Sequence, residues 1–177
     1  MIYVVRHGET DWNIAKKLQG STDIELNEVG LKQAKELADK IKDIKFDVCF
    51  CSPLKRTRKT CEIAFKGKVI FDNRLVERFY GNLEGAIAVK SNPLFHDAWN
   101  SNKQIKNFIE SISEVEERVF NLLDEIRANY KGKNILIITH GGVIRIIKSY
   151  FQGRPVDGDY LQAFGFPENG VVLAYDC

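Results

Sequence analysis

The sequence has no long uninterrupted apolar segment, and nothing in it approaches the roughly 20 apolar residues that a membrane-spanning helix needs. Its first residues, Met1 to Arg6, include neither the apolar stretch nor the small-residue cleavage site of a secretory signal. No long basic run occurs, and 26 Lys and Arg residues nearly balance 24 Asp and Glu residues. These absences predict a cytoplasmic protein without a membrane or nucleic-acid partner.

Cysteine and proline are also scarce, with four residues of each. Cys49 and Cys51 fall on the same face of an expected strand, but no CxxC pair and no histidine at zinc-ligand spacing accompanies them. We therefore expect buried, reduced thiols. The prolines are scattered, and neither a repeat nor a linker interrupts the 177 residues, so a single domain over 1–177 is predicted.

Apolar runs and helical spacing alternate along the chain. Strands are predicted at 2–5, 46–51, 68–71 and 134–139, with two late strands near 162–166 and 171–175. A helix is predicted after Asn27, and a second one runs from the N-cap Ser52 and the following Pro53 to about residue 65. Two more are predicted, one after a capping box of Ser113 and Glu116 and one over 142–151. Residues 8–26 and 74–112 are predicted to be mostly loop, with one or two short helices in the second segment. The pattern indicates an α/β fold, a three-layer sandwich whose mostly parallel central sheet has helices on both faces.

Ligands in such folds bind beyond the carboxyl ends of the strands. That rule selects three places here, which are the segments 6–8, 52–56 and 140–142. Each place offers cations, histidines or the amides of a helix start, and these are the groups that an anion needs.

Two of the three histidines, His7 and His140, have matching positions, each directly after an apolar strand and directly before a glycine. Taken singly, each could be a satisfied structural histidine, but the matching placement at one sheet edge favours a shared site. A neutral imidazole held in one tautomer is a competent nucleophile toward phosphorus. The residues therefore suggest phosphoryl transfer with His7 as the nucleophile.

Phosphoryl transfer requires stabilisation of charge on the phosphate oxygens, which guanidinium groups can provide. Arg6 and Arg56 are the candidates for binding phosphate oxygens through two N–H groups each. Arg56 lies in a basic neighbourhood, however, and could instead be a solvated arginine. His140 and Asn13 could add further donors. A carboxylic acid must also supply a proton to the leaving group. The candidates are Glu77, Glu84 and Glu9, each with a plain surface glutamate as the alternative.

Several motifs, taken in order, resemble those of the histidine phosphatase superfamily, also called the phosphoglycerate-mutase-like family. The blocks that match are VRHGET at 5–10 followed by Asn13 and Gln19-Gly20, LNEVGLKQA at 26–34, SPLKRT at 52–57, the acid loop from Leu75 to Gly85, Glu110-Ser111 with Arg118, and HGGVIR at 140–145. The resemblance spans nearly the whole chain, and it favours the small phosphatase branch and a phosphoglycerate-mutase-like fold.

The resemblance implies a role for each matching position. His7 would be the phosphorylated nucleophile, Glu77 the proton donor, and Arg6, Arg56 and His140 phosphate ligands. The substrate would also meet the following residues: Asn13, Gln19, Gly20, Tyr80 and Gly141. Glu84 would be structural or lie at the pocket rim. The family uses no metal, so the resemblance implies neither a metal nor a cofactor.

The family contains phosphatases and mutases, and both remain possible from the residues. The sequence around Glu77 to Gly81 resembles a mutase loop, but no arginine occurs between Arg78 and Arg118 to retain a second anionic group. We therefore predict a metal-independent phosphomonoester hydrolase acting on a small phosphorylated metabolite, as a monomer or homodimer. The alternatives are a cofactor-dependent phosphoglycerate mutase and a non-catalytic phosphoryl-binding module.

Residues 86–108 are predicted to be a cap-like insertion within the domain. With Phe95, His96 and Trp99, they could form an apolar lid over the pocket or a small satellite core under a loop. His96 is expected at the surface.

Overall fold

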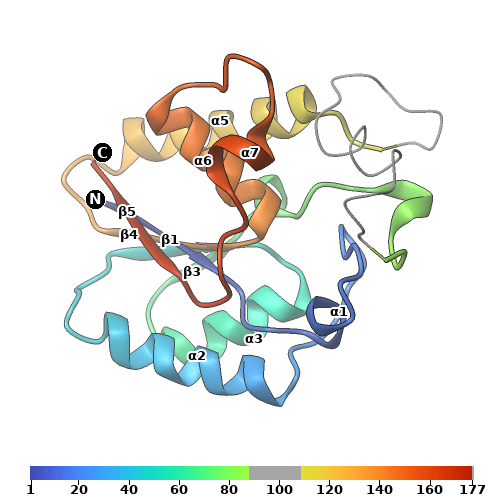
Figure 1. Cartoon of the computed structure of the whole chain (residues 1–177). Coiled ribbons are helices and arrows are strands. Elements are labelled where there is room, and N and C mark those ends of the chain that lie inside the picture. Colours follow the sequence, from blue (N-terminus) through green and yellow to red (C-terminus); the bar gives the residue numbers. More distant parts are fainter. Residues whose placement is uncertain (88–108, 177) are drawn as a thin grey trace.

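A computed structural model of the chain describes residues 1–87 and 109–176 (Figure 1). Within them, a five-stranded sheet has the order β3-β2-β4-β1-β5. The strands are β1 (Ile2–Arg6), β2 (Val48–Cys51), β3 (Val69–Phe71), β4 (Ile135–Thr139) and β5 (Val172–Tyr175). The pairings β1–β4, β2–β4 and β2–β3 are parallel, and β5 pairs antiparallel with β1. The prediction of a mostly parallel sheet is therefore confirmed.

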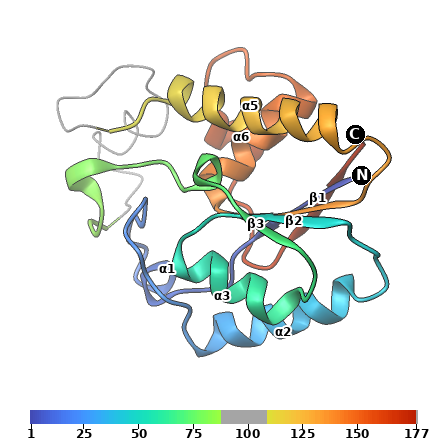
Figure 2. The ribbon, with the colours of Figure 1, turned by 180° about the vertical axis from the view of Figure 1, so that it is seen from behind.

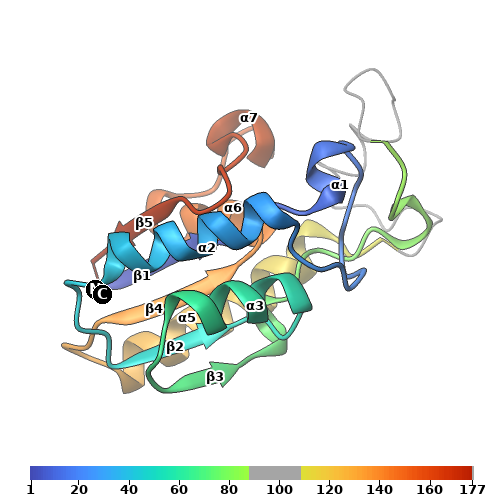
Figure 3. The same cartoon turned by 90° about the horizontal axis from the view of Figure 1, so that it is seen from below.

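Helices cover both faces of this sheet. On one face lie α2 (Glu28–Ile41) and α3 (Lys55–Ala64), and on the other lie α5 (Ile112–Asn129) and α6 (Gly141–Gln152) (Figure 1, Figure 2). Figure 3 shows α2 and α3 running side by side, with α1 (Asp11–Ile14) beyond the carboxyl ends of the parallel strands. The predicted three layers are thus confirmed. None of the helices in the described segments combines the length and apolar character that a bilayer crossing requires.

The core is divided by the sheet, because successive side chains of a strand point to opposite faces. Val4 and Ile137 belong to the apolar cluster with the buried stripe of α5, whereas Val5 and Ile138 face α2 and α3. The α5 stripe contains the predicted residues Val115, Val119, Leu122, Leu123 and Ile126. Cys49, Cys51 and Cys61 are free and buried in the second cluster, which confirms the expected reduced thiols at 49 and 51.

The late strand predicted near 162–166 is wrong, because residues Tyr160–Phe164 form helix α7. Asp159 caps this helix by accepting a hydrogen bond from Gln162 N at 2.8 Å, and Gly165 ends it with a φ of 64°. The aromatic rings of Tyr160 and Phe164 join the core cluster beside α6. Packing against α6 therefore decides the conformation of a segment whose composition suits a strand.

Two helix starts also differ from the predictions. Ser52 does not cap α3, whose N-cap is Leu54. The Ser52 hydroxyl accepts from His140 Nε2 at 2.8 Å and from Leu54 N at 3.5 Å. The capping box of α5 consists of Ser111 and Glu114 and not of Ser113 and Glu116. The spacing S-x-x-E occurs twice here, shifted by two residues, so the pattern alone cannot select the right pair.

The remaining described segments agree with the loop predictions. Asn27 caps α2, accepting from Gly30 N at 2.8 Å. A short 3₁₀ helix, η1 (Asn73–Leu75), leads into the acid loop, and a second one, η2 (Gly81–Leu83), lies within it. Residues 88–108 of the predicted cap, including His96, lie outside the described residues, so that prediction stays open.

Candidate active site

The register of the sheet brings the two predicted histidines together. Arg6 of β1 is paired with Thr139 of β4, so His7 and His140 leave neighbouring parallel strands at the same edge. The amide of His7 continues the ladder by donating to Thr139 O at 3.0 Å. The two rings are buried, with centroids 5.2 Å apart and planes inclined by 60°.

His7 is held in one tautomer. Its Nδ1 lies 2.6 Å from Gly8 O, and because a carbonyl only accepts, Nδ1 carries the proton and donates it. Nε2 therefore keeps its lone pair. Burial, together with the charges of Arg56 and Arg6, holds the pKa of His7 well below its ordinary value, so the ring is neutral at neutral pH.

Gly8 allows a close approach of two main-chain segments. A side chain on Gly8 would collide with the carbonyl oxygen of Gly30 in α2, and a side chain on Gly30 would collide with the carbonyl oxygen of Glu9. The glycine after His7 therefore allows the start of α2 to pack closely against the loop that follows His7.

Arg56 is fully buried, and each nitrogen of its guanidinium has a partner. Nε donates to His140 Nδ1 at 3.2 Å, Nη1 to Thr22 O at 2.8 Å and Nη2 to Gly20 O at 2.7 Å. Because Nδ1 of His140 accepts, its Nε2 carries the hydrogen and donates to Ser52 Oγ. Burial lowers the pKa of Arg56 to about 10, which leaves it a cation at neutral pH.

Glu84 holds the loop that positions Arg56. Its carboxylate accepts from the amides of Ser21 and Thr22, both at 2.9 Å, and from both of their hydroxyls. It also accepts from Tyr80 N at 3.1 Å. Gly20 has a φ of 52°, and a side chain there would collide with Glu84. Glu84 thus connects the loop at 20–22 to the acid loop, which fits the structural role expected for it.

Arg6 is anchored by a segment to which the sequence predictions gave no role. Its Nη1 donates to Pro167 O at 2.6 Å, Gly170 N donates to Arg6 O at 3.1 Å, and the Asn169 side chain donates to His7 O at 2.8 Å. Arg6 Nε is buried and has no hydrogen-bond partner among the described residues. Burial lowers the pKa of Arg6 to about 10, against an opposing effect of Glu77.

Glu77 lies at the start of α6. Its Oε2 accepts from Gly142 N at 2.9 Å and its Oε1 from Arg78 N at 2.9 Å. A side chain on Gly142 would collide with Glu77 Oε1, so the carboxylate of Glu77 would have to move. Of the other candidate acids, Glu84 is engaged with the loop at 20–22, and Glu9 accepts from the Asn27 side chain at 3.1 Å. Glu77 is thus the candidate bonded to the motif that begins with His140.

The other predicted residues are placed as follows. Asn13 Oδ1 accepts from Thr10 N and Thr10 Oγ1, both at 3.0 Å. Asn13 therefore forms a capping box with Thr10 at the start of α1. Gln19 is buried, and its Oε1 has no hydrogen-bond partner in the described part of the chain. The backbone of Gly141 lies against Arg6, where an added Cβ would be 3.4 Å from Nε. Tyr80 is buried, and burial raises its pKa to about 12.

Comparison with known proteins gives a consistent result. A profile of the histidine phosphatase superfamily (branch 1) matches residues 2–170. Phosphoglycerate mutase-like protein 4 of Arabidopsis thaliana is 38% identical over 165 residues, which cover 87% of this chain and 71% of the relative. A metal-independent phosphoserine phosphatase of the same plant is 35% identical over 157 residues, covering 82% and 66%. A crystal structure of a phosphoserine phosphatase mutant from Entamoeba histolytica, in complex with phosphoserine, superposes with a TM-score of 0.82 at 26% identity, covering 97% of this chain and 87% of that one.

Proposed function

Since the chain belongs to the histidine phosphatase superfamily, we propose that it hydrolyses small phosphomonoesters, with His7 taking up the phosphoryl group. The observation that carries this proposal is the state of His7, a buried neutral ring whose Nδ1 is fixed on Gly8 O and whose Nε2 keeps its lone pair. The guanidinium of Arg56 and that of Arg6, whose Nε has no hydrogen-bond partner in residues 1–87 and 109–176, supply positive charge around the ring.

In the first half of the reaction, Nε2 of His7 attacks phosphorus and the ester P–O bond breaks. The departing oxygen takes a proton from the carboxyl group of Glu77, so the alcohol leaves as a neutral molecule. Arg6 and Arg56 stabilise the charge on the equatorial oxygens, which is the main task of a phosphoryl-transfer site.

In the second half, water attacks the phosphohistidine and the N–P bond breaks. Glu77, now a carboxylate, accepts the proton of the attacking water, and the products are inorganic phosphate and neutral His7. One carboxyl group thus serves as acid and then as base. The amides of Gly142 and Arg78 hold its oxygens in place in both halves.

The relatives support a small phosphorylated substrate for this chain but do not identify which one. One is a metal-independent phosphoserine phosphatase, and another was crystallised with phosphoserine. We propose hydrolysis and not mutase chemistry because a mutase must retain a doubly phosphorylated intermediate. The 54 residues between Gly85 and His140 contain Arg118 and Arg127 as their only arginines, and both belong to α5.

The test is an assay with p-nitrophenyl phosphate, with and without a chelator, on the wild-type protein and on His7→Ala. We expect turnover that the chelator leaves unchanged, no turnover in the variant, and a trapped phosphoenzyme in the wild type only. Full activity of His7→Ala would refute the proposal. Transfer of phosphate between positions of phosphoglycerate, dependent on added bisphosphoglycerate, would identify a mutase instead.

A further inference from the structure

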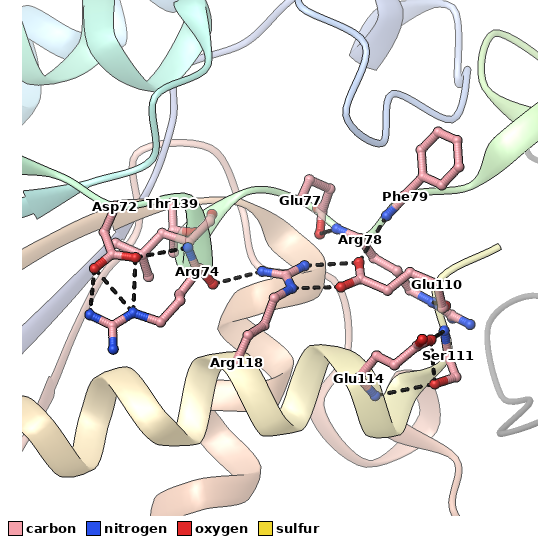
Figure 4. A network of polar contacts seen from close by, with 11 residues as sticks. Asp72, Arg74, Glu77, Arg78, Phe79, Glu110, Ser111, Glu114, Arg118 and Thr139 are labelled. Atoms are coloured by element: carbon pink, nitrogen blue, oxygen red, sulfur yellow. Dashed lines mark hydrogen bonds and ion pairs between the residues drawn. The ribbon is translucent and has the colours of Figure 1, made fainter. Parts of the chain in front are cut away.

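An ion pair on the far side of the acid loop has no part in the chemistry described so far. It joins Arg118, on α5, to Glu110, just before that helix (Figure 4). Arg118 Nε lies 2.6 Å from Glu110 Oε1, and Nη2 lies 3.0 Å from Oε2. This is a bidentate contact, which fixes the orientation of both groups as well as their distance. Both side chains are about four-fifths buried, each being 20% exposed.

The ion pair is hydrogen-bonded to the main chain on both sides of Glu77. Arg118 Nη1 donates to Arg74 O at 2.6 Å, three residues before Glu77. Phe79, two residues after Glu77, donates its amide to Glu110 Oε2 at 3.1 Å and accepts from Glu110 N at 3.0 Å. The segment 74–79, which includes Glu77, is therefore held at both ends by residues of one ion pair.

The pair itself rests on rigid parts of the fold. The capping box of Ser111 and Glu114 fixes the helix start directly after Glu110. At the other end, Leu75 O accepts from the Thr139 hydroxyl of β4 at 2.8 Å. The buried stripe of α5 joins that helix to the core, so Arg118 is carried on an element that has little freedom to move.

We infer that Arg118 and Glu110 are positioning residues for Glu77, an inference that rests on the proposed function. Within the described residues, neither side chain is hydrogen-bonded to His7, Arg6 or Arg56. The pair therefore serves proton transfer to the leaving group and leaves phosphate binding alone. Proton transfer requires the acid within hydrogen-bond reach of its target, so a small displacement of Glu77 suffices to lose it.

This role predicts an effect that depends on the leaving group. 4-Nitrophenolate is a weak base and departs without a proton, whereas phenolate is more basic and needs one. The parameter to measure is kcat/KM, because it reports the steps up to formation of the phosphohistidine and excludes the later attack by water. In Arg118→Ala we expect kcat/KM for phenyl phosphate to fall by roughly 10–100-fold, which is within the usual contribution of general acid catalysis. The value for 4-nitrophenyl phosphate should change by no more than about threefold, and the inhibition constant of inorganic phosphate should stay the same.

Three further variants make the test specific. Glu110→Gln should show the same leaving-group dependence, and Arg118→Lys, which keeps the charge, should recover part of the loss. Arg127→Ala is the control, because Arg127 lies on the same helix but donates to Tyr150 on α6, away from the acid loop. Its kinetics should match those of the wild type. If Arg118→Ala does not fold, the two conservative variants carry the test, because they keep the side-chain volume.

Equal losses on both esters, or no loss on either, in variants with native thermal melting would overturn the positioning role. Measuring the activity of His7→Ala in the same assays distinguishes this outcome from a failure of the proposed function. Retained activity in His7→Ala removes the proposed function itself, whereas strict dependence on His7 with a loss that ignores the leaving group removes only the role of the ion pair.

Discussion

Arg56 donates through Nε to Nδ1 of His140 at 3.2 Å, and both groups are completely buried. A guanidinium never accepts a hydrogen bond, so this contact fixes the tautomer of His140 and directs its Nε2–H toward Ser52. The ring of His140 thereby orients the guanidinium of Arg56 beside it.

The first prediction concerns this contact. An asparagine at position 140 can place its Oδ1 near the position of Nδ1 and still accept from Arg56, whereas a glutamine reaches only toward the position of Nε2. We expect His140→Asn to keep more phosphate affinity than His140→Gln, by roughly tenfold, since a hydrogen bond to a charged group contributes about 1.5–3 kcal/mol. Inhibition constants for inorganic phosphate and vanadate measure this. The reverse order of the two variants would show that Arg56 does not depend on Nδ1.

The second prediction concerns Glu84 and the loop at 20–22. Glu84→Gln removes one acceptor oxygen and directs an NH₂ group toward amides that can only donate. Because the carbonyls of Gly20 and Thr22 orient Arg56, we expect phosphate to bind roughly tenfold more weakly. Titration with phosphate measures the change. Glu62→Gln, on the exposed side of α3, is the matched control and should bind phosphate as the wild type does.

The third prediction concerns Gly142. A methyl group there would collide with Glu77 Oε1, so Gly142→Ala should displace the acid and lower kcat/KM for phenyl phosphate by at least about tenfold. Position 142 is helical, where alanine is favoured over glycine, so thermal stability should not fall through helix propensity. Gly141→Ala should cost much less, because its added Cβ would lie 3.4 Å from Arg6. Similar losses in both variants would argue against a specific clash at 142.

The fourth prediction concerns stability against pH. Burial, the largest effect, and then the charge of Arg56 hold the pKa values of His7 and His140 well below 6.5, so both rings stay neutral in the folded state. In the unfolded chain they protonate near 6.5. Below that pH the unfolded state binds more protons, so the free energy of unfolding decreases, by roughly 1 kcal/mol per pH unit for each ring. Urea unfolding between pH 7 and 5 measures the slope.

The control for this fourth experiment is His7→Gln, which removes one of the two titrating rings. Its free energy of unfolding should decrease less steeply below pH 6.5 than that of the wild type. Equal slopes in the two proteins would mean that His7 takes up its proton as readily in the folded as in the unfolded state, which contradicts the lowered pKa of the buried ring.

Much of the site could be predicted because the pairing of parallel strands brings the residues that follow them to the same edge of the sheet. His7 and His140 follow two apolar strands that pair in parallel, so their meeting depends only on the sheet having the expected form. The segment at 167–170 could not be predicted in the same way. It acts through a backbone carbonyl, a backbone amide and one asparagine, and main-chain groups leave no trace in the residue pattern.

Other errors arose where two local solutions compete. Ser111 and Ser113 have the same spacing to a glutamate, and only the tertiary position of α5 selects between them. Ser52 is a good helix cap by type, but α3 begins only at Lys55, and the Ser52 hydroxyl is bonded to His140. Tyr160–Phe164 suits a strand by composition and becomes a helix through packing on α6. Each choice is decided by a partner far away in sequence.

The central position of β1, between β4 and β5, has a consequence for biosynthesis. Its neighbours are residues 135–139 and 172–175, which are synthesised much later than the strand itself. The edge that faces β4 stays unpaired until residues 135–139 have left the ribosome, and the edge that faces β5 until residues 172–175 have left it. His7 and His140 therefore meet late, and we expect catalytic activity to begin only when synthesis of this domain is nearly complete.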